Sequence, residues 1–172
     1  MSSPHPFTEH RSRRLAVTLP HAYAQAVADY ENLVPEFPAT AFADCATWQD
    51  HLDLATTAAP HHFMRYQQME MSPLMGISGA TWNATHYLMG NHTIAARMFR
   101  HDPAVMLHAP LRTLLVEDRD GATTFVIDQP GLLFGSYGSA DIDAVGRELD
   151  GYVARLIELL GGEAPQVLVE RR

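Results

Sequence analysis

Residues 82–130 constrain the fold more than any other part of this sequence. They begin with a run in which apolar and polar positions alternate, as in a strand, and pass through Gly90-Asn91 into a short amphipathic helix. Two β-rich runs, 111–117 and 123–129, follow, and the short turn with Asp-Gly between them predicts a hairpin. Strands paired as hairpins, rather than spaced as regular βαβ units, predict an α+β fold, an antiparallel sheet with helices packed on one face.

Patterns elsewhere in the chain predict the remaining elements. Apolar residues at spacings of three and four predict helices, and alternating runs predict further strands. The elements predicted in this way are strands over 15–19 and 62–71, helices over 21–34, 47–57, 92–101 and 139–160, and an edge strand over 167–170. The glycine-rich segment 130–139 predicts a mobile loop that could cover a cavity with Phe134 and Tyr137.

We expect a single domain. A chain of 172 residues with 47% hydrophobic content can bury a core without disulfides or metals. The domain is expected to cover residues 13–172, after a polar and disordered segment over 1–12. Residues 35–60 are predicted to be an insertion in this domain, because a proline-rich and alanine-rich connection opens them.

The composition excludes several classes of function. A net charge of −8 argues against a nucleic-acid partner. The chain has no lysine, which excludes a pyridoxal phosphate Schiff base and a P-loop nucleotide site. Cys45 is the single cysteine, so no thiolate cluster can hold an iron–sulfur centre. No apolar run is long enough to span a membrane and no secretion signal is recognisable, so we expect a cytoplasmic protein.

His86 is the candidate catalytic residue that the sequence favours. Alternation places it on one strand face with Trp82, Ala84 and Leu88, and we expect that face to be buried. A neutral imidazole in such a place can act as a general base, although it can equally be a core histidine with a hydrogen-bond partner. The candidate carboxylates to orient it are strand-end residues that can also be simply solvated, Glu70 and Asp128.

The leading hypothesis is therefore a pocket for a small hydrophobic molecule between sheet and helices, with acid–base chemistry of the isomerase or cyclase type at His86. Arg112 can pair with a ligand carboxylate or form a structural salt bridge. The other predicted ligand-binding residues are methionine, aromatic and leucine side chains that suit an apolar ligand: Met64, Tyr66, Trp82, Leu88, Met98 and Phe134.

Two alternatives stay open. Ten histidines and eight methionines allow a haem-binding protein, with His86, His61 or His62 as the axial ligand. The chain can also be a noncatalytic interaction module that acts through a dimer surface. The histidines that flank the helix over 92–101 are interpreted as surface or capping residues: His92, His101 and His108.

The C-terminal half, residues 87–160, resembles the small bacterial DUF302 family. The resemblance is carried by the segments YLMGNHTIAARMF and DPAVMLHAPLRTLLVEDRDGATTFVIDQP and by the final amphipathic helix with its ELD. It implies a compact α+β domain that often self-associates, so a homodimer is expected. Because the family has no assigned function, the resemblance implies no catalytic residues.

Overall fold

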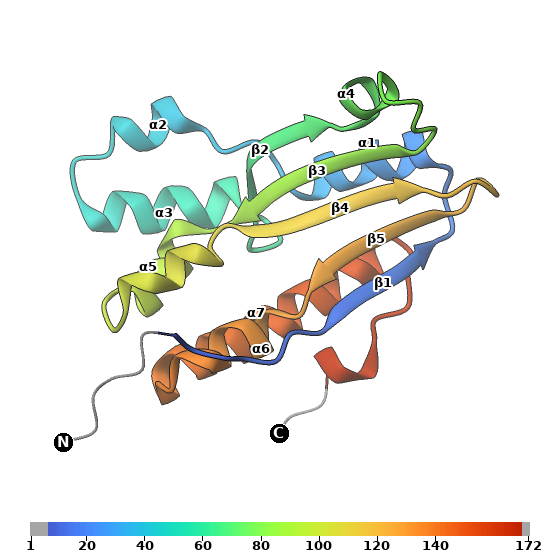
Figure 1. Cartoon of the computed structure of the whole chain (residues 1–172). Coiled ribbons are helices and arrows are strands. Elements are labelled where there is room, and N and C mark those ends of the chain that lie inside the picture. Colours follow the sequence, from blue (N-terminus) through green and yellow to red (C-terminus); the bar gives the residue numbers. More distant parts are fainter. Residues whose placement is uncertain (1–6, 170–172) are drawn as a thin grey trace.

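A five-stranded antiparallel sheet is the centre of the fold (Figure 1). The structure is a computed structural model, and it describes residues 7–169. Its strands lie in the order β1-β5-β4-β3-β2, so the first strand of the chain forms one edge and the second forms the other. The strands are β1 (Arg14–Leu19), β2 (Met64–Glu70), β3 (Asn83–Gly90), β4 (Leu111–Glu117) and β5 (Thr123–Asp128).

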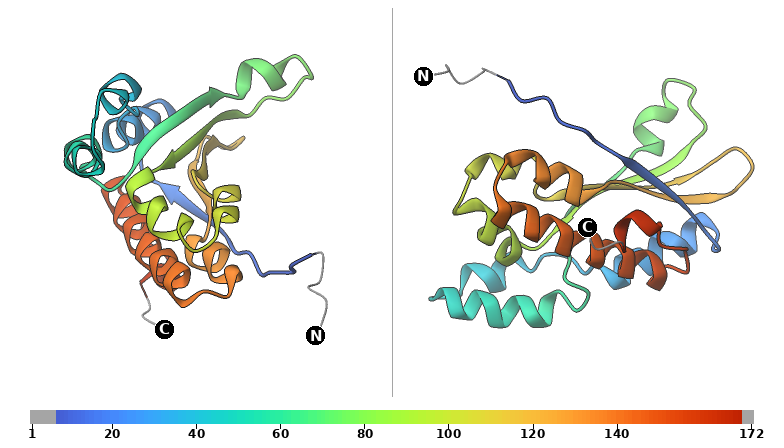
Figure 2. Two further views of the ribbon diagram at one scale, coloured as in Figure 1. Left: turned by 90° about the vertical axis from the view of Figure 1, so that its left-hand side faces the viewer. Right: turned by 90° about the horizontal axis from the view of Figure 1, so that it is seen from below.

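Helices cover one face of this sheet (Figure 2). The two main covering helices are α1 (Tyr23–Leu33) and the long α7 (Ala140–Leu159). The shorter helices are α2 (Ala39–Ala43), α3 (Trp48–Ala58), α4 (Ser72–Gly76), α5 (His92–Phe99), α6 (Pro130–Phe134) and the 3-10 turns η1 (Pro103–Leu107), η2 (Gly135–Tyr137) and η3 (Gln166–Leu168). This arrangement confirms the predicted α+β fold with helices on one sheet face. No described helix has the length and apolar character needed to span a membrane.

The covered face of β3 carries Thr85, Tyr87 and Met89, all of which are buried. This face contains hydroxyl groups because α1 supplies partners for them. Tyr23 Oη lies 2.6 Å from Thr85 Oγ1, and Tyr87 donates a hydrogen bond to Glu31 at 3.0 Å. A buried hydroxyl with a partner costs little, so polar positions can face the core here.

The uncovered face of the sheet carries the alternate residues. His86 lies there opposite Leu114, which in turn pairs with Val126. All three side chains are half-buried. The prediction that His86 lies on the buried face with its even-numbered neighbours is therefore wrong, because α1 and α7 cover the odd-numbered positions of β3 instead.

Three further predictions need correction or restriction. The segment predicted as a loop over 130–139 forms α6 and η2, and Phe134 within it is fully buried. The edge strand predicted over 167–170 is wrong in its described residues, 167–169, because η3 covers 167 and 168. Residue 170 lies outside the described part of the chain. Of the segment 1–12, residues 1–6 lie outside the described part of the chain.

Residues 35–60 form a small unit beside β2 with a core of its own. Phe42 of α2 packs with Ala55 of α3, Ala59 and Met64 in a cluster separate from the main core. The predicted start of α3 is confirmed. Thr47 caps it, since its hydroxyl accepts from the backbone nitrogen of Asp50 at 3.2 Å while the Asp50 carboxylate accepts from the backbone nitrogen of Thr47 at 2.8 Å. Helix α3 of this unit contacts α5, which lines the candidate site.

Candidate functional site

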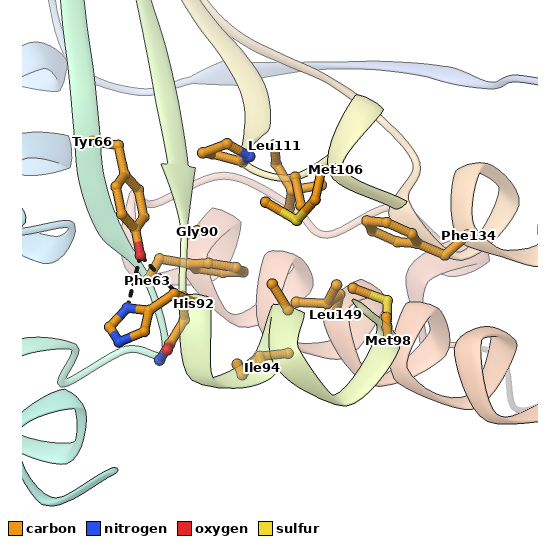
Figure 3. Close-up of a pocket in the computed structure, with 14 residues that line it drawn as sticks. Phe63, Tyr66, Gly90, His92, Ile94, Met98, Met106, Leu111, Phe134 and Leu149 are labelled. Atoms are coloured by element: carbon orange, nitrogen blue, oxygen red, sulfur yellow. Dashed lines mark hydrogen bonds between the residues drawn. The ribbon is translucent and has the colours of Figure 1, made fainter. Parts of the chain in front are cut away.

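An apolar cavity of about 240 Å³ lies where β3 ends and α5 begins (Figure 3). We call it the α5 cavity. Its walls come from β2 and the residue before it, from the end of β3, from α5 and η1, from the start of β4, and from α6 and α7. The side chains that give it its apolar character are Phe63, Ile94, Ala95, Met98, Met106, Pro110, Leu111, Phe134 and Leu149, and its polar lining residues are Tyr66, Asn91 and His92.

The turn between β3 and α5 shapes one end of the cavity. Asn91 caps α5, because its side-chain oxygen accepts from the backbone nitrogen of Thr93 at 3.0 Å. Gly90, just before it, has no side chain, and a Cβ there would lie 3.4 Å from Pro110 Cβ and 3.7 Å from Tyr66 Cε2. Tyr66 and Pro110 thus lie on either side of Gly90 at ordinary contact distance.

A chain of hydrogen bonds begins at that end. Tyr66 Oη lies 3.1 Å from His92 Nδ1 and also accepts from the backbone nitrogen of His92 at 3.0 Å. The other ring nitrogen, His92 Nε2, lies 3.1 Å from His51 Nδ1. Three residues from β2, α5 and α3 thus form a continuous chain, and Figure 3 shows its inner half, Tyr66 and His92, at one end of the cavity.

Aromatic rings enclose this hydrogen-bond chain. Phe37 stacks on Tyr66 with ring centroids 4.6 Å apart, and Phe42 meets the His92 ring edge to face at 4.6 Å. Trp48 stacks on His51 at 5.8 Å. These rings hold the imidazoles in place and shield the chain from water on several sides.

Burial favours the neutral forms of Tyr66 and His92. It lowers the pKa of His92 below its ordinary value of 6.5, and the neighbouring His51 lowers it further. Burial also raises the pKa of the Tyr66 hydroxyl. A neutral imidazole bonded to a neutral phenol can both give and accept a proton, which is the requirement for acid–base chemistry.

Three of the predicted ligand-binding residues line this cavity, namely Tyr66, Met98 and Phe134. The other four lie elsewhere. Met64 is buried in the cluster of α2 and α3, and Leu88 is half-buried on the uncovered sheet face. Trp82 is exposed beside Arg119, and Arg112 is exposed on the uncovered face.

The three predicted catalytic residues do not meet. His86 does not line the α5 cavity, and its position on the uncovered sheet face separates it from the helices. Glu70 pairs across the strands with Thr85, so it belongs to the opposite face from His86. Asp128 is held by Arg14, whose Nε donates to the Asp128 carboxylate at 2.9 Å. The structure therefore contains no His86–carboxylate pair among the described residues.

Of the histidines proposed as metal or haem ligands, His86 lies apart from His61 and His62. The His62 ring stacks on Tyr152 with centroids 3.7 Å apart, and His86 belongs to the uncovered sheet face. His61 is half-buried. In the part of the chain that the structure describes, no group of three or more histidine, cysteine, aspartate or glutamate side chains is arranged to hold a metal ion.

Sequence reasoning missed most of the apolar wall, including Phe63, Met106 and Leu149, and both histidines of the hydrogen-bond chain. His92 was interpreted as a surface or capping residue, and His51 was not considered at all. A signal for His51 exists, because it precedes Leu54, Ala55 and Ala58 at helical spacing and so places a polar ring in the apolar stripe of α3. His92 has no comparable signal, because its partners are 26 and 41 residues away in the sequence.

Comparisons with known proteins agree with this architecture. The chain resembles a solved structure from Bacillus stearothermophilus, described as an uncharacterized conserved protein DUF302, with a TM-score of 0.64 and 12% sequence identity. The match covers 86% of this chain and 97% of that one, and at this identity it shows the fold. No curated protein matches the chain significantly.

The family assignment follows from the sequence itself. Residues 53–158 match the sequence model of a domain of unknown function, DUF302. This match spans more than half of the chain and includes β2 to β5, α5 and most of α7. The chain therefore belongs to the DUF302 family.

Proposed function

We propose that this protein binds a small, mainly apolar molecule in the α5 cavity, and that an oxygen atom of this molecule faces Tyr66. The observation that carries the proposal is an apolar cavity lined at one end by Tyr66, whose hydroxyl lies within hydrogen-bond distance of the His92 imidazole. Pockets for small molecules typically combine an apolar wall with a few polar groups that fix the orientation of the ligand. Acid–base chemistry at the bound oxygen would use Tyr66 and His92, with His92 in the role first assigned to His86.

The volume of the cavity limits the ligand. An engineered cavity of about 150 Å³ in another protein holds one benzene molecule. In the same proportion, a cavity of about 240 Å³ accommodates roughly ten carbon atoms. A molecule of two fused six-membered rings with one oxygen substituent has this size.

The other hypotheses have less support. A haem macrocycle is much larger than two fused rings, and none of the proposed axial ligands, His61, His62 and His86, lines the α5 cavity. The homodimer rests on the family resemblance, and native mass spectrometry tests it. The cytoplasmic location also remains a prediction.

Calorimetric titration with three probes tests the proposal: 2-naphthol, 1-tetralone and naphthalene. We expect 2-naphthol and 1-tetralone to bind more tightly than naphthalene, because only they can bond to Tyr66. Ala95→Phe places a phenyl group in the cavity and should weaken binding by about tenfold or more, equivalent to roughly 1.4 kcal/mol.

Ala104→Phe is the matched control. Ala104 lies on η1, is exposed and does not line the cavity, so the same substitution there should leave binding unchanged. Equal binding to both variants would place the probes outside the α5 cavity. If none of the three probes bound with a dissociation constant below about 1 mM, the proposed function would be refuted.

A further inference from the structure

We propose that Tyr66, His92 and His51 form a proton relay, which carries one proton between the ligand oxygen in the α5 cavity and the solvent beside α3. The inference rests on the proposed function and narrows its substrate class. The ligand would be a small apolar molecule whose oxygen gains or loses a proton, as in an enol and its enolate or a phenol and its phenolate.

The first support is the completeness of the chain. Both ring nitrogens of His92 are engaged, one with Tyr66 Oη at 3.1 Å and the other with His51 Nδ1 at 3.1 Å. The backbone nitrogen of His92 also donates to Tyr66 Oη at 3.0 Å and so fixes the phenol in place. Donor and acceptor atoms alternate along the chain without a gap, as a relay requires.

The second support is that the chain has two neutral proton arrangements. In the first, Tyr66 donates to His92 Nδ1, and His92 Nε2–H donates to His51 Nδ1. In the second, every donor and acceptor is exchanged: His51 Nδ1–H donates to His92 Nε2, and His92 Nδ1–H donates to Tyr66 Oη. The backbone bond to Tyr66 is the same in both.

These arrangements give the Tyr66 hydroxyl opposite roles toward a ligand. A phenol oxygen has one proton and two lone pairs. In the first arrangement one lone pair remains free, so Tyr66 can accept a bond from the ligand. In the second arrangement both lone pairs are used, and the proton is free to be donated to the ligand.

One balanced step converts the second arrangement into the first. The Tyr66 proton passes to an anionic ligand oxygen, and the His92 Nδ1 proton replaces it on Tyr66. The His51 Nδ1 proton passes to His92 Nε2, and a proton from solvent binds His51 Nε2. The ligand gains one proton, the solvent loses one, and the three side chains remain neutral. The reverse sequence removes a proton from the ligand.

The outer end of the relay is suited to exchange with solvent. His51 is half-buried beside Trp48, whose exposed fraction is 48%. Among the described residues, no hydrogen bond is formed by His51 Nε2, the nitrogen that the relay would use toward solvent. The inner ring, His92, has a pKa lowered by burial. His92 therefore favours passing a proton on over retaining it as a charge.

Two probes of opposite hydrogen-bonding character test the relay. 1-Tetralone can only accept at its oxygen, and indole can only donate through its N–H group. The protein is labelled with ¹⁵N in histidine and ¹³C in the methionine methyl groups, so that NMR reports ring tautomers and cavity occupancy together. With indole bound, His92 and His51 should both carry the proton on Nε2. With 1-tetralone bound, both should carry it on Nδ1.

Two tyrosine variants make the test specific. In Tyr66→Phe, both probes should still shift the methyl signals of Met98 and Met106, but the two imidazoles should keep the same tautomers with either probe. The control is Tyr137→Phe, which removes a hydroxyl that donates to the Ala104 carbonyl, away from the relay. In this variant, His92 and His51 should still change tautomer between indole and 1-tetralone.

The possible failures are distinguishable. If neither probe shifts the Met98 and Met106 methyl signals, the proposed function is overturned, and the relay falls with it. If the probes shift these signals while the tautomers of His92 and His51 stay the same, the relay is overturned and ligand binding stands. If the tautomer of His92 changed between the probes while that of His51 did not, the relay would end at His92 and the path to solvent would be overturned.

Discussion

We predict that the Tyr66 hydroxyl stabilises the folded protein in the absence of any ligand. Tyr66→Phe removes one oxygen and keeps the ring, so the stacking on Phe37 at 4.6 Å is preserved. The oxygen takes part in two hydrogen bonds, one with the backbone nitrogen of His92 and one with its Nδ1. An ordinary hydrogen bond contributes about 1 kcal/mol net, so full loss of both would cost about 2 kcal/mol. Because both residues are half-buried and water can partly replace the hydroxyl, we expect a loss of about 1–2 kcal/mol.

Urea unfolding followed by far-UV circular dichroism measures this loss. The control is Tyr137→Phe, which removes a hydroxyl that donates one hydrogen bond, to the Ala104 carbonyl at 2.9 Å. That variant should lose about 0.5 kcal/mol or less, because water can solvate the exposed Ala104 carbonyl. If Tyr66→Phe lost no more stability than Tyr137→Phe, the Tyr66 hydroxyl would not be holding the start of α5 in the way described.

Two other predictions concern pH and the core. Burial lowers the pKa of His62, His86, His92 and His108 below 6.5, so the unfolded chain binds more protons than the folded one near that pH. The free energy of unfolding should therefore fall as pH is lowered from about 7.5 to about 5.5, and thermal melts that showed a constant or rising midpoint would contradict this. Asp150 is buried and accepts from Gln129 Nε2 and from the backbone nitrogen of Gly131, each at 2.7 Å. Asp150→Ala leaves the Gly131 N–H unpaired and removes one of the two bonds of Gln129 Nε2, which still donates to the Val167 carbonyl at 3.2 Å. It should cost about 2–3 kcal/mol in urea unfolding, whereas Asp150→Asn, which keeps one acceptor, should cost less.

Much of the fold could be predicted because local patterns determine it. The strand over 111–117 and the hairpin that follows were predicted from alternation and one turn, and the structure confirms them. Ser139 as the cap of α7 and Thr47 as the cap of α3 are confirmed for the same reason, since a capping side chain acts on backbone groups two or three residues away.

The covered face of β3 could not be predicted in this way. Alternation shows which residues share a face, but both faces of this strand contain apolar side chains. The choice depended on α1, whose Tyr23 and Glu31 bond to Thr85 and Tyr87 and so allow two polar positions to be buried. These partners are more than fifty residues distant in the sequence, and no periodic pattern connects them.

The glycine-rich segment 130–139 was misinterpreted for a related reason. A Cβ on Gly131 would overlap Asp150 Oδ2, and a Cβ on Gly146 would lie 2.9 Å from Phe134 Cβ. These glycines let α6 and α7 pack closely, which explains why a sequence typical of a mobile loop forms an ordered helix here. Within the segment, Gly131 provides space for packing, whereas Gly138 ends η2 in a left-handed conformation with a φ of 66°.

The enclosure of His92 has an evolutionary consequence. Phe37, Phe42, Trp48 and His51 all precede residue 53, where the match to the family begins, whereas Tyr66 and His92 lie inside it. Substitutions in α2 or in the first turn of α3 would therefore change the contacts of His92 with Phe42 and His51 outside the segment that matches the family. In the relay that we propose, the path to solvent would therefore vary between relatives independently of the apolar wall of the α5 cavity.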